Sequence, residues 1–511
     1  MPSKRTSKTT TEKLAESLEA LAELQRRGRV AVRPGDLNRM HRERLLKNGF
    51  LREVIRGWYI PANPEEMKGE STAWYAAYWD FCAAYCNERF GNQWCLSPEQ
   101  SLLLHAGNFS VPGQLLVRAP QGQNNIVRLP YDTSLMDLRS EIPQGKDIEE
   151  KNGLRLFTLP AALIAGTPTF FAQNPLEMRT ALAMVGNASE LLGGLLEGGH
   201  STVAGRLAGA FRNIGRAALA DEILETMRAA AYSVRENDPF QEKRVLFPTS
   251  RSLSPHVHRI RLMWQEMRKA VIDYFPKIAM RRSNPKTYLQ QVDQVYVNDA
   301  YHSLSIEGYR VSRELIEKVR GGSWNPDADD LDRQHRNALA ARGYYLAFQK
   351  VKASLRRVLR KENPGAVAEA DHGSWYRELF APSVTAGLLK AADLAGYRQG
   401  PVYIRQSKHV PPSAEAVRDL MPAFFELLKE EKEASVRVVL GHFIFVYIHP
   451  YADGNGRIGR FLMNVMLAAG AVPWLVIPVE KRQTYMSALE AASVERNIVP
   501  FSKFLGSLLK K

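Results

Sequence analysis

A tight turn between two apolar segments constrains this chain more than any other stretch. The turn is His449–Arg460, with the sequence HPYADGNGRIGR. LGHFIFVYI precedes it and FLMNVMLAA follows it, and both have the apolar composition of buried helices. Asp453 to Gly456 are poor residues for a helix interior. The pattern predicts a helix, a turn and a second helix that begins near Asn455.

The turn has the composition of a phosphate-binding site. Gly454 and Gly456 permit left-handed backbone angles and close approach, so neighbouring amide groups can converge on an anion. A helix that begins at Asn455 adds its unpaired N–H groups and its positive dipole end to the same place. Arg457 and Arg460 are three residues apart and share a helix face, which suits a polyphosphate better than a single anion.

Two further side chains of the turn can take part in chemistry. Asp453 offers a hard oxygen ligand for the Mg²⁺ that usually accompanies a polyphosphate. His449, whose unperturbed pKa is about 6.5, can take a proton from a hydroxyl group at neutral pH. A helix-capping turn with solvated arginines is the alternative interpretation.

This stretch resembles the signature of the Fic family, H-x-F-x-[D/E]-G-N-G-R-x-x-R, with Tyr451 at the usual Phe position. The resemblance implies an all-helical core with a short β-hairpin flap, and an enzyme that transfers AMP from ATP to a protein hydroxyl. His449 would be the general base and Asp453 the Mg²⁺ ligand. Gly454–Arg457 would bind the ATP phosphates, and Arg460 would hold the terminal one.

A second motif supports the same resemblance. Ser303 to Gly308 reads SLSIEG and fits the family's inhibitory pattern [S/T]-x-x-x-E-[G/N]. The resemblance implies that Glu307 pairs with Arg460 and displaces the γ-phosphate of ATP. An arginine and a carboxylate form a bidentate, charge-assisted pair. The alternative is an ordinary glutamate at the end of a helix, followed by the capping Gly308.

Two more stretches match family features. Residues 400–412, GPVYIRQSKHVPP, look like the flap, a hairpin that aligns the target segment by strand addition. A plain surface hairpin is the alternative. Tyr485, in YMSALEAA, matches a family tyrosine near the adenine. A buried core tyrosine remains an open interpretation there.

The charge and the cysteines limit the class of protein. The formal net charge of +15 favours an anionic partner, which can be nucleic acid, nucleotide or an acidic protein. Cys82, Cys86 and Cys95 suit neither a zinc site nor a disulfide framework, so buried reduced thiols are expected. No apolar signal segment or membrane-spanning stretch is recognised, so we expect a cytoplasmic protein without a membrane partner.

The first 61 residues have the order of a winged helix-turn-helix. A helix from Glu12 to Arg27 is followed by a basic helix that Asp36 would cap, and FLREVI and WYIP form a two-stranded wing. This order looks like the N-terminal module of AbiEi-type antitoxins, and it predicts DNA binding. A protein-interaction module is the alternative. The candidate DNA contacts are Arg39, Arg42, Arg44, Lys47, Arg52 and Arg56.

Three further parts follow this module. Residues 62–235 predict a mixed α+β regulatory or interaction domain, with QLLVRAP and NNIVRLP as paired strands and long helices at 174–192 and 202–231. Residues 236–254 are a predicted linker. Residues 255–511 predict a mainly helical Fic-like catalytic domain, with one helix at about 374–390. The whole chain is therefore expected to be mainly α.

These patterns lead to one main hypothesis and two alternatives. The main hypothesis is an auto-inhibited adenylyltransferase that uses ATP and Mg²⁺, modifies a Ser, Thr or Tyr hydroxyl of a target protein or of the chain itself, and binds DNA. The first alternative is a DNA-binding regulator or antitoxin-like protein whose Fic site senses nucleotide. The second is transfer of another phosphate-linked group. A homodimer, with inhibition within or between chains, stays open.

Overall fold

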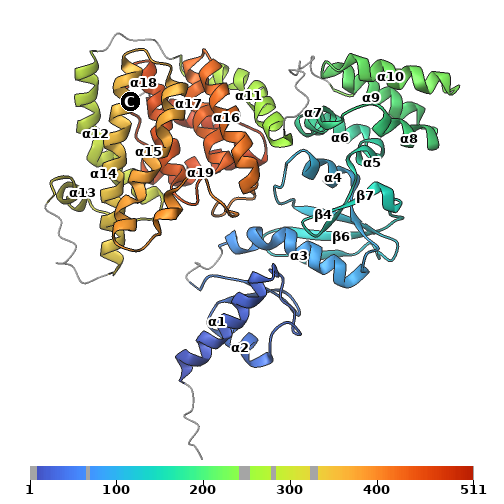
Figure 1. Cartoon of the computed structure of the whole chain (residues 1–511), viewed down its shortest axis with the longest axis horizontal. Coiled ribbons are helices and arrows are strands. Elements are labelled where there is room, and N and C mark those ends of the chain that lie inside the picture. Colours follow the sequence, from blue (N-terminus) through green and yellow to red (C-terminus); the bar gives the residue numbers. More distant parts are fainter. Residues whose placement is uncertain (1–8, 65–69, 241–253, 278–283, 323–331, 510–511) are drawn as a thin grey trace, which may run out of the picture. The chain divides into compact units, whose positions relative to one another are not determined.

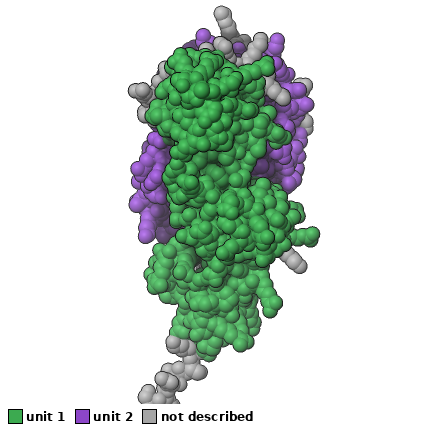
Figure 2. All heavy atoms as spheres, turned by 90° about the vertical axis from the view of Figure 1, so that its right-hand side faces the viewer, with its two compact units in different colours: residues 1–255, 403–410 green, residues 256–402, 411–511 purple. Residues whose placement is uncertain are grey.

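The computed structural model describes residues 9–64, 70–240, 254–277, 284–322 and 332–509. They form two compact units (Figures 1 and 2). The first unit comprises Met1–Pro255 and Tyr403–Val410, and the second comprises His256–Val402 and Pro411–Lys511. Most of the predicted linker, residues 236–254, lies outside the described residues.

The first unit begins with two helices and a hairpin. These are α1 (Thr10–Arg26), α2 (Arg39–Lys47) and the antiparallel strands β1 (Leu51–Ile55) and β2 (Trp58–Pro61). The elements follow one another in the predicted order around a small apolar core that includes Leu21, Val32 and Leu45.

The predicted cap of α2 is wrong. Asn38 caps this helix, because its Oδ1 accepts from the amide of Met40 at 2.9 Å. Asp36 is used elsewhere: it accepts from the amide of Arg33 at 2.8 Å and pairs with Arg29 at 2.6 Å.

A four-stranded sheet follows helix α3 (Thr72–Phe90). Its strands are β3 (Cys95–Leu96), β4 (Gln114–Ala119), β5 (Ile126–Leu129) and β6 (Thr133–Arg139), in the order β3-β4-β6-β5. The predicted pairing of β4 with β5 is therefore wrong, because β6 lies between them, parallel to β4 and antiparallel to β5. Asp137 of β6 stabilises this order: its carboxylate accepts from the amides of Gln123 and Asn125 at 2.8 and 3.1 Å.

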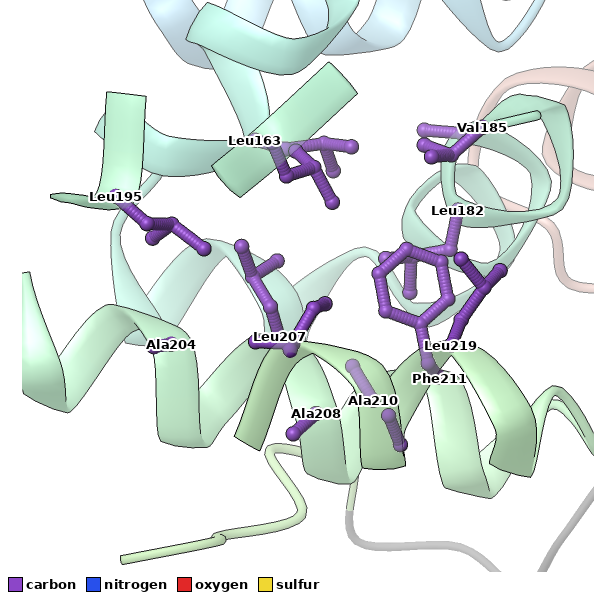
Figure 3. Close-up of a cluster of buried hydrophobic side chains, with 14 of the residues drawn as sticks. Leu163, Leu182, Val185, Leu195, Ala204, Leu207, Ala208, Ala210, Phe211 and Leu219 are labelled. Atoms are coloured by element: carbon purple, nitrogen blue, oxygen red, sulfur yellow. The ribbon is translucent and has the colours of Figure 1, made fainter. Parts of the chain in front are cut away.

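The rest of the first unit is mostly helical. Its elements are α4 (Pro98–His105), the strand pair β7 (Ile148–Lys151) and β8 (Leu154–Phe157), α5 (Leu159–Ala165), α6 (Pro168–Gln173), α7 (Pro175–Met184), α8 (Ser189–Glu197), α9 (Ser201–Asn213) and α10 (Ala217–Ala229). Leu163, Leu182, Leu207 and Phe211 meet in the core between these helices (Figure 3). The three cysteines are buried and unbridged, as predicted.

The two long helices predicted here are each divided in two. The first break lies between α7 and α8, where the Glu190 carboxylate fixes the connecting loop by accepting from the amides of Gly186 and Asn187. The second lies between α9 and α10 at Gly215, whose φ of +81° is unfavourable for other residues. Apolar periodicity continues across both breaks, so it did not reveal them.

The second unit is helical, which confirms the mainly α fold class. Its helices are α11 (Pro255–Tyr274), α12 (Pro285–Ile306), α13 (Arg313–Arg320), α14 (Asp332–Leu359), α15 (Pro364–Thr385), α16 (Ala414–Glu430), α17 (Ala434–Ile448), α18 (Asn455–Ala469), α19 (Arg482–Val494) and α20 (Val499–Leu509). Helix α15 begins ten residues before its predicted start, because Asn363 caps it and Pro364 occupies its first position. No described helix is long and apolar enough to cross a membrane.

The predicted flap hairpin is wrong in its conformation. No strand is present at residues 400–412, all of which are described. The amide of Ser407 donates to the carbonyl of Ile404 at 3.1 Å, and Gln406 has a φ of +59°. The segment therefore forms a turn, and residues 403–410 belong to the first unit.

Candidate active site

The predicted turn connects α17 to α18 in the core of the second unit. His449 ends α17 in the left-handed region at φ +53°, and Gly454 precedes α18 at φ +80°. Asn455 holds the loop together: its Oδ1 accepts from the amide of Tyr451 at 2.9 Å, and its Nδ2 donates to the carbonyl of Tyr451 at 2.8 Å. One amide side chain therefore fixes both sides of the turn.

Tyr451, which stands at the usual Phe position, fits the core as an aromatic ring. It is 1% exposed and stacks on Tyr376, with ring centroids 3.9 Å apart and an interplanar angle of 8°. Burial raises the pKa of its hydroxyl, so the ring stays neutral. The substitution therefore keeps the packing that a phenylalanine would provide.

The histidine has the protonation state that a general base requires. Its Nδ1 lies 3.0 Å from the carbonyl oxygen of Val446, which can only accept, so Nδ1 carries the hydrogen and Nε2 keeps its lone pair. Burial lowers the pKa of His449 below its usual value of 6.5. Arg398 further fixes this residue by donating to the His449 carbonyl at 2.8 Å. The imidazole is thus neutral at pH 7.

Arg460 joins the turn to the predicted inhibitory motif. Its Nε donates to Ser303 Oγ at 2.9 Å, and its Nη2 donates to Glu307 Oε1 at 2.6 Å and to the Ser303 carbonyl at 3.1 Å. The guanidinium is 4% exposed, and its buried Nη1 has no hydrogen-bond partner among the described residues. An anion in this place could satisfy that remaining donor.

The carboxylate of Glu307 lies against the first turn of α18. A Cβ atom built on Gly456 would be only 2.4 Å from Glu307 Oε1, so a side chain at this position would displace the carboxylate. Glu307 ends α12, and Gly308 follows at φ +89°. The carboxylate thus takes the position at the helix N-terminus that suits an anion.

Arg457 and Asp453 face each other across the same turn. Arg457 is 1% exposed and lies between the rings of Tyr309 and Phe380, at 5.3 and 5.0 Å from their centroids. Its Nη2 donates to Asp453 Oδ2 at 3.2 Å. Sequence reasoning missed both aromatic rings, because neither lies in a recognisable motif.

Asp453 is accessible to a cation. Its side chain is 62% exposed and borders a cavity of about 670 Å³, whose wall also includes Arg457, Tyr376 and Tyr397. The described residues contain no group of three or more His, Cys, Asp or Glu side chains arranged for a metal. A Mg²⁺ ion held by this carboxylate would therefore need phosphate and water oxygens as its other ligands.

Tyr485 lies inside the core beneath α17. It is 1% exposed, and its hydroxyl forms a 2.7 Å hydrogen bond with Nε2 of His442. Burial lowers the pKa of His442 to about 4, so this imidazole is neutral. His442 was missed from the sequence because it belongs to the apolar run before the turn. An adenine contact by Tyr485 stays a prediction.

The six predicted DNA-binding residues have two kinds of environment. Arg39, Lys47 and Arg56 are exposed, and Arg39 pairs with Glu43 at 2.7 Å. The other three donate to groups within the first unit: Arg42 to Pro34 O at 2.9 Å, Arg44 to Lys13 O at 2.6 Å and Arg52 to Tyr131 Oη at 2.9 Å. The first three residues are the better candidates for contacts to phosphate.

Comparison with known proteins identifies the second unit's central part. Residues 370–467 match the sequence model of the Fic/DOC family, so this region is a Fic/DOC domain. The protein adenylyltransferases Fic of Drosophila virilis and Drosophila willistoni are each 29% identical over 237 residues. The match covers 46% of this chain and 43% and 42% of those relatives, so the chain matches less than half of their length.

Solved structures of Fic proteins are also similar to this chain. Fic-1 from C. elegans aligns with a TM-score of 0.38 and 16% identity, covering 66% of this chain and 96% of that structure. A Fic domain containing signaling protein from Bacteroides thetaiotaomicron aligns with a TM-score of 0.34 and 16% identity, covering 50% and 92%.

Proposed function

We propose that this chain is a protein adenylyltransferase that Glu307 holds inactive. It would transfer AMP from ATP to a Ser, Thr or Tyr hydroxyl of a target protein or of the chain itself. The observation that carries the proposal is the position of the Glu307 carboxylate, 2.6 Å from Arg460 Nη2 and against Gly456 at the start of α18. The names of the relatives support the reaction.

The chain's own residues supply proton transfer and positioning. Nε2 of His449 takes the proton of the target hydroxyl, while the hydroxyl oxygen attacks the α-phosphate of ATP. The bond between the α-phosphorus and pyrophosphate then breaks. The amides of Gly454 to Arg457 and the Arg460 guanidinium bind the triphosphate. A Mg²⁺ ion at Asp453 would neutralise charge on the phosphates.

Inhibition follows from competition for one cationic site. Nη2 of Arg460 donates a hydrogen bond to Glu307, and the γ-phosphate would bind the same guanidinium and the same helix N-terminus. Two anions in contact there would repel each other. With Glu307 in place, ATP would bind with its phosphates displaced from the in-line geometry that transfer requires.

Intact-mass analysis tests this proposal directly. Wild type, Glu307→Gly and Glu307→Gly/His449→Ala are incubated with Mg²⁺ and α-labelled ATP. We expect an adduct of one AMP in Glu307→Gly alone, because only this variant has both a free phosphate site and a base. Labelling that persists without His449 contradicts the mechanism.

A matched control separates inhibition from a general effect of the substitution. Glu362 is exposed in the loop between α14 and α15, and Glu362→Gly makes the same chemical change away from the site. This variant should stay as inactive as the wild type. Equal activation in both variants would contradict a specific role for Glu307.

The second candidate is a DNA-binding regulator whose Fic/DOC domain senses nucleotide. The exposed side chains of Arg39, Lys47 and Arg56 favour DNA binding by the first unit. This candidate requires specific DNA affinity that survives His449→Ala, together with no adduct in Glu307→Gly. An adduct in Glu307→Gly would decide for the enzyme.

A further inference from the structure

The segment formed by residues 403–410 is bound as part of the first unit, although the residues before and after it belong to the second. Its main anchor is Arg405. The Arg405 guanidinium contacts both carboxylate oxygens of Glu70, with Nε–Oε1 and Nη2–Oε2 distances of 2.7 Å. Because the Glu70 side chain is only 8% exposed, this bidentate pair compensates a largely desolvated charge.

Backbone and apolar contacts hold the same segment. The amide of Gln406 donates to Thr72 Oγ1 at 3.2 Å, and the carbonyl of Lys408 accepts from the amide of Val111 at 2.9 Å. Val410 packs against the aromatic core that surrounds α3. The first unit therefore binds a charged side chain, two backbone groups and an apolar side chain of this segment.

This conformation does not allow strand addition. A target strand needs an extended partner whose amide and carbonyl groups are available along one edge. Here the chain turns at Ile404–Ser407 with Gln406 at φ +59°, and the backbone groups of Gln406 and Lys408 already have partners. The segment must leave the first unit before it can pair with another strand.

We propose that the first unit provides a second inhibition of transfer, because it prevents residues 403–410 from binding an extended segment of the target protein. This inference rests on the proposed function and adds to it: Glu307 blocks the phosphate site, whereas the Glu70–Arg405 pair blocks the docking of the target. The two contacts act on different substrates, so loss of the Glu70–Arg405 pair should raise transfer further once Glu307 no longer blocks the phosphate site.

Hydrogen exchange measures the hold on the segment without any need for activity. Arg405→Glu places a second carboxylate beside Glu70, so peptides covering 403–410 should exchange at least several-fold faster than in the wild type. The charge-reversed pair Glu70→Arg/Arg405→Glu should restore slow exchange. Arg356→Glu, the same change at an exposed position of α14, should leave these peptides unaffected. Unchanged exchange in Arg405→Glu overturns the anchor.

Transfer measures the consequence of release. In the Glu307→Gly background, Arg405→Glu should raise the initial rate of AMP incorporation from α-labelled ATP several-fold, and the charge-reversed pair should return it. If Glu307→Gly incorporates AMP and Arg405→Glu does not change the rate, the second inhibition alone is overturned. If Glu307→Gly incorporates no AMP, the proposed function fails, and the proposal of a second inhibition fails with it.

Discussion

Tyr451 shows at the residue scale what the active-site turn needs from its aromatic position. The ring is buried and stacked on Tyr376, and the structure uses its faces and edges for packing. The residue therefore contributes mainly apolar area and ring contacts, which phenylalanine also provides. The hydroxyl adds little that the turn requires.

Replacement of Tyr451 should distinguish the ring from the hydroxyl. Tyr451→Phe should keep transfer in the Glu307→Gly background and change the unfolding free energy by less than about 1.5 kcal/mol. Tyr451→Ala should cost roughly 3–5 kcal/mol, because it leaves a cavity in the core. Chemical denaturation measures both. A loss of transfer in Tyr451→Phe with unchanged stability would show a role for the hydroxyl.

The pH dependence of transfer should report His449. Burial and the nearby Arg398 lower its pKa, whereas Glu307 and Asp453 raise it. In Glu307→Gly one of the raising charges is gone, so the pKa lies below the usual 6.5. The rate should rise with pH through that pKa and then stay level to about pH 8. An acid limb centred above about pH 7 would contradict this assignment.

At the element scale, α12 and its C-cap residue carry three polar side chains on one face. Asp299, Ser303 and Glu307 are four residues apart, and Ser303 and Glu307 both bind Arg460. Asp299 continues this face inward, where its Oδ2 accepts from the hydroxyl of Tyr344 at 2.7 Å. Burial raises the Asp299 pKa to about 6. Helix α12, which ends at Glu307, therefore contains a buried carboxyl group that costs stability when it ionises.

Asp299→Asn should remove this cost. A raised carboxyl pKa stabilises the fold below about pH 4, and this contribution is lost as pH rises through about 6. The variant, relative to wild type, should gain about 3 kcal/mol between about pH 3.5 and pH 8, from two pKa units at 1.36 kcal/mol each. Urea denaturation at both pH values measures the difference. A pH-independent difference would show that Asp299 is not the titrating group.

At the scale of the whole molecule, part of the excess positive charge is exposed on the N-terminal module, where its role in DNA binding can be tested. The chain carries a formal net charge of +15, and Arg39, Lys47 and Arg56 are exposed in its N-terminal module. Arg44 differs from them, because its guanidinium binds Lys13 O and Ser17 Oγ within the module. Charge and structure therefore separate residues that the sequence had grouped together.

DNA binding measured at several salt concentrations tests this separation. Arg39→Ala/Lys47→Ala/Arg56→Ala should lower the slope of log affinity against log salt by about three, because each phosphate contact contributes about 0.9. Arg44→Ala should leave the slope unchanged and lower the stability of the module. A reduced slope in Arg44→Ala would contradict its internal role, and an unchanged slope in the triple variant would exclude these contacts.

The sequence alone determined the features that depend on local chemistry. The turn between α17 and α18 and the left-handed Gly454 were predicted because neighbouring residues encode helix boundaries, whereas Glu307 was singled out by its resemblance to a family motif. The mainly helical second unit followed from apolar periodicity for the same reason. These local preferences act within a short segment, whether or not the segment is packed against the rest of the chain.

Tertiary structure decided what depends on partners far apart in the chain. Strand order could not be predicted, because β6 lies between β4 and β5 and Asp137 of β6 binds the turn between those two strands. Residues 403–410 have a strand-like sequence, but Glu70, more than 330 residues earlier, holds them as a turn. Tyr309 and Phe380 meet at Arg457 only in the folded unit. Such contacts join residues that are far apart in the sequence, so they contribute stabilising energy only when the fold brings the partners together.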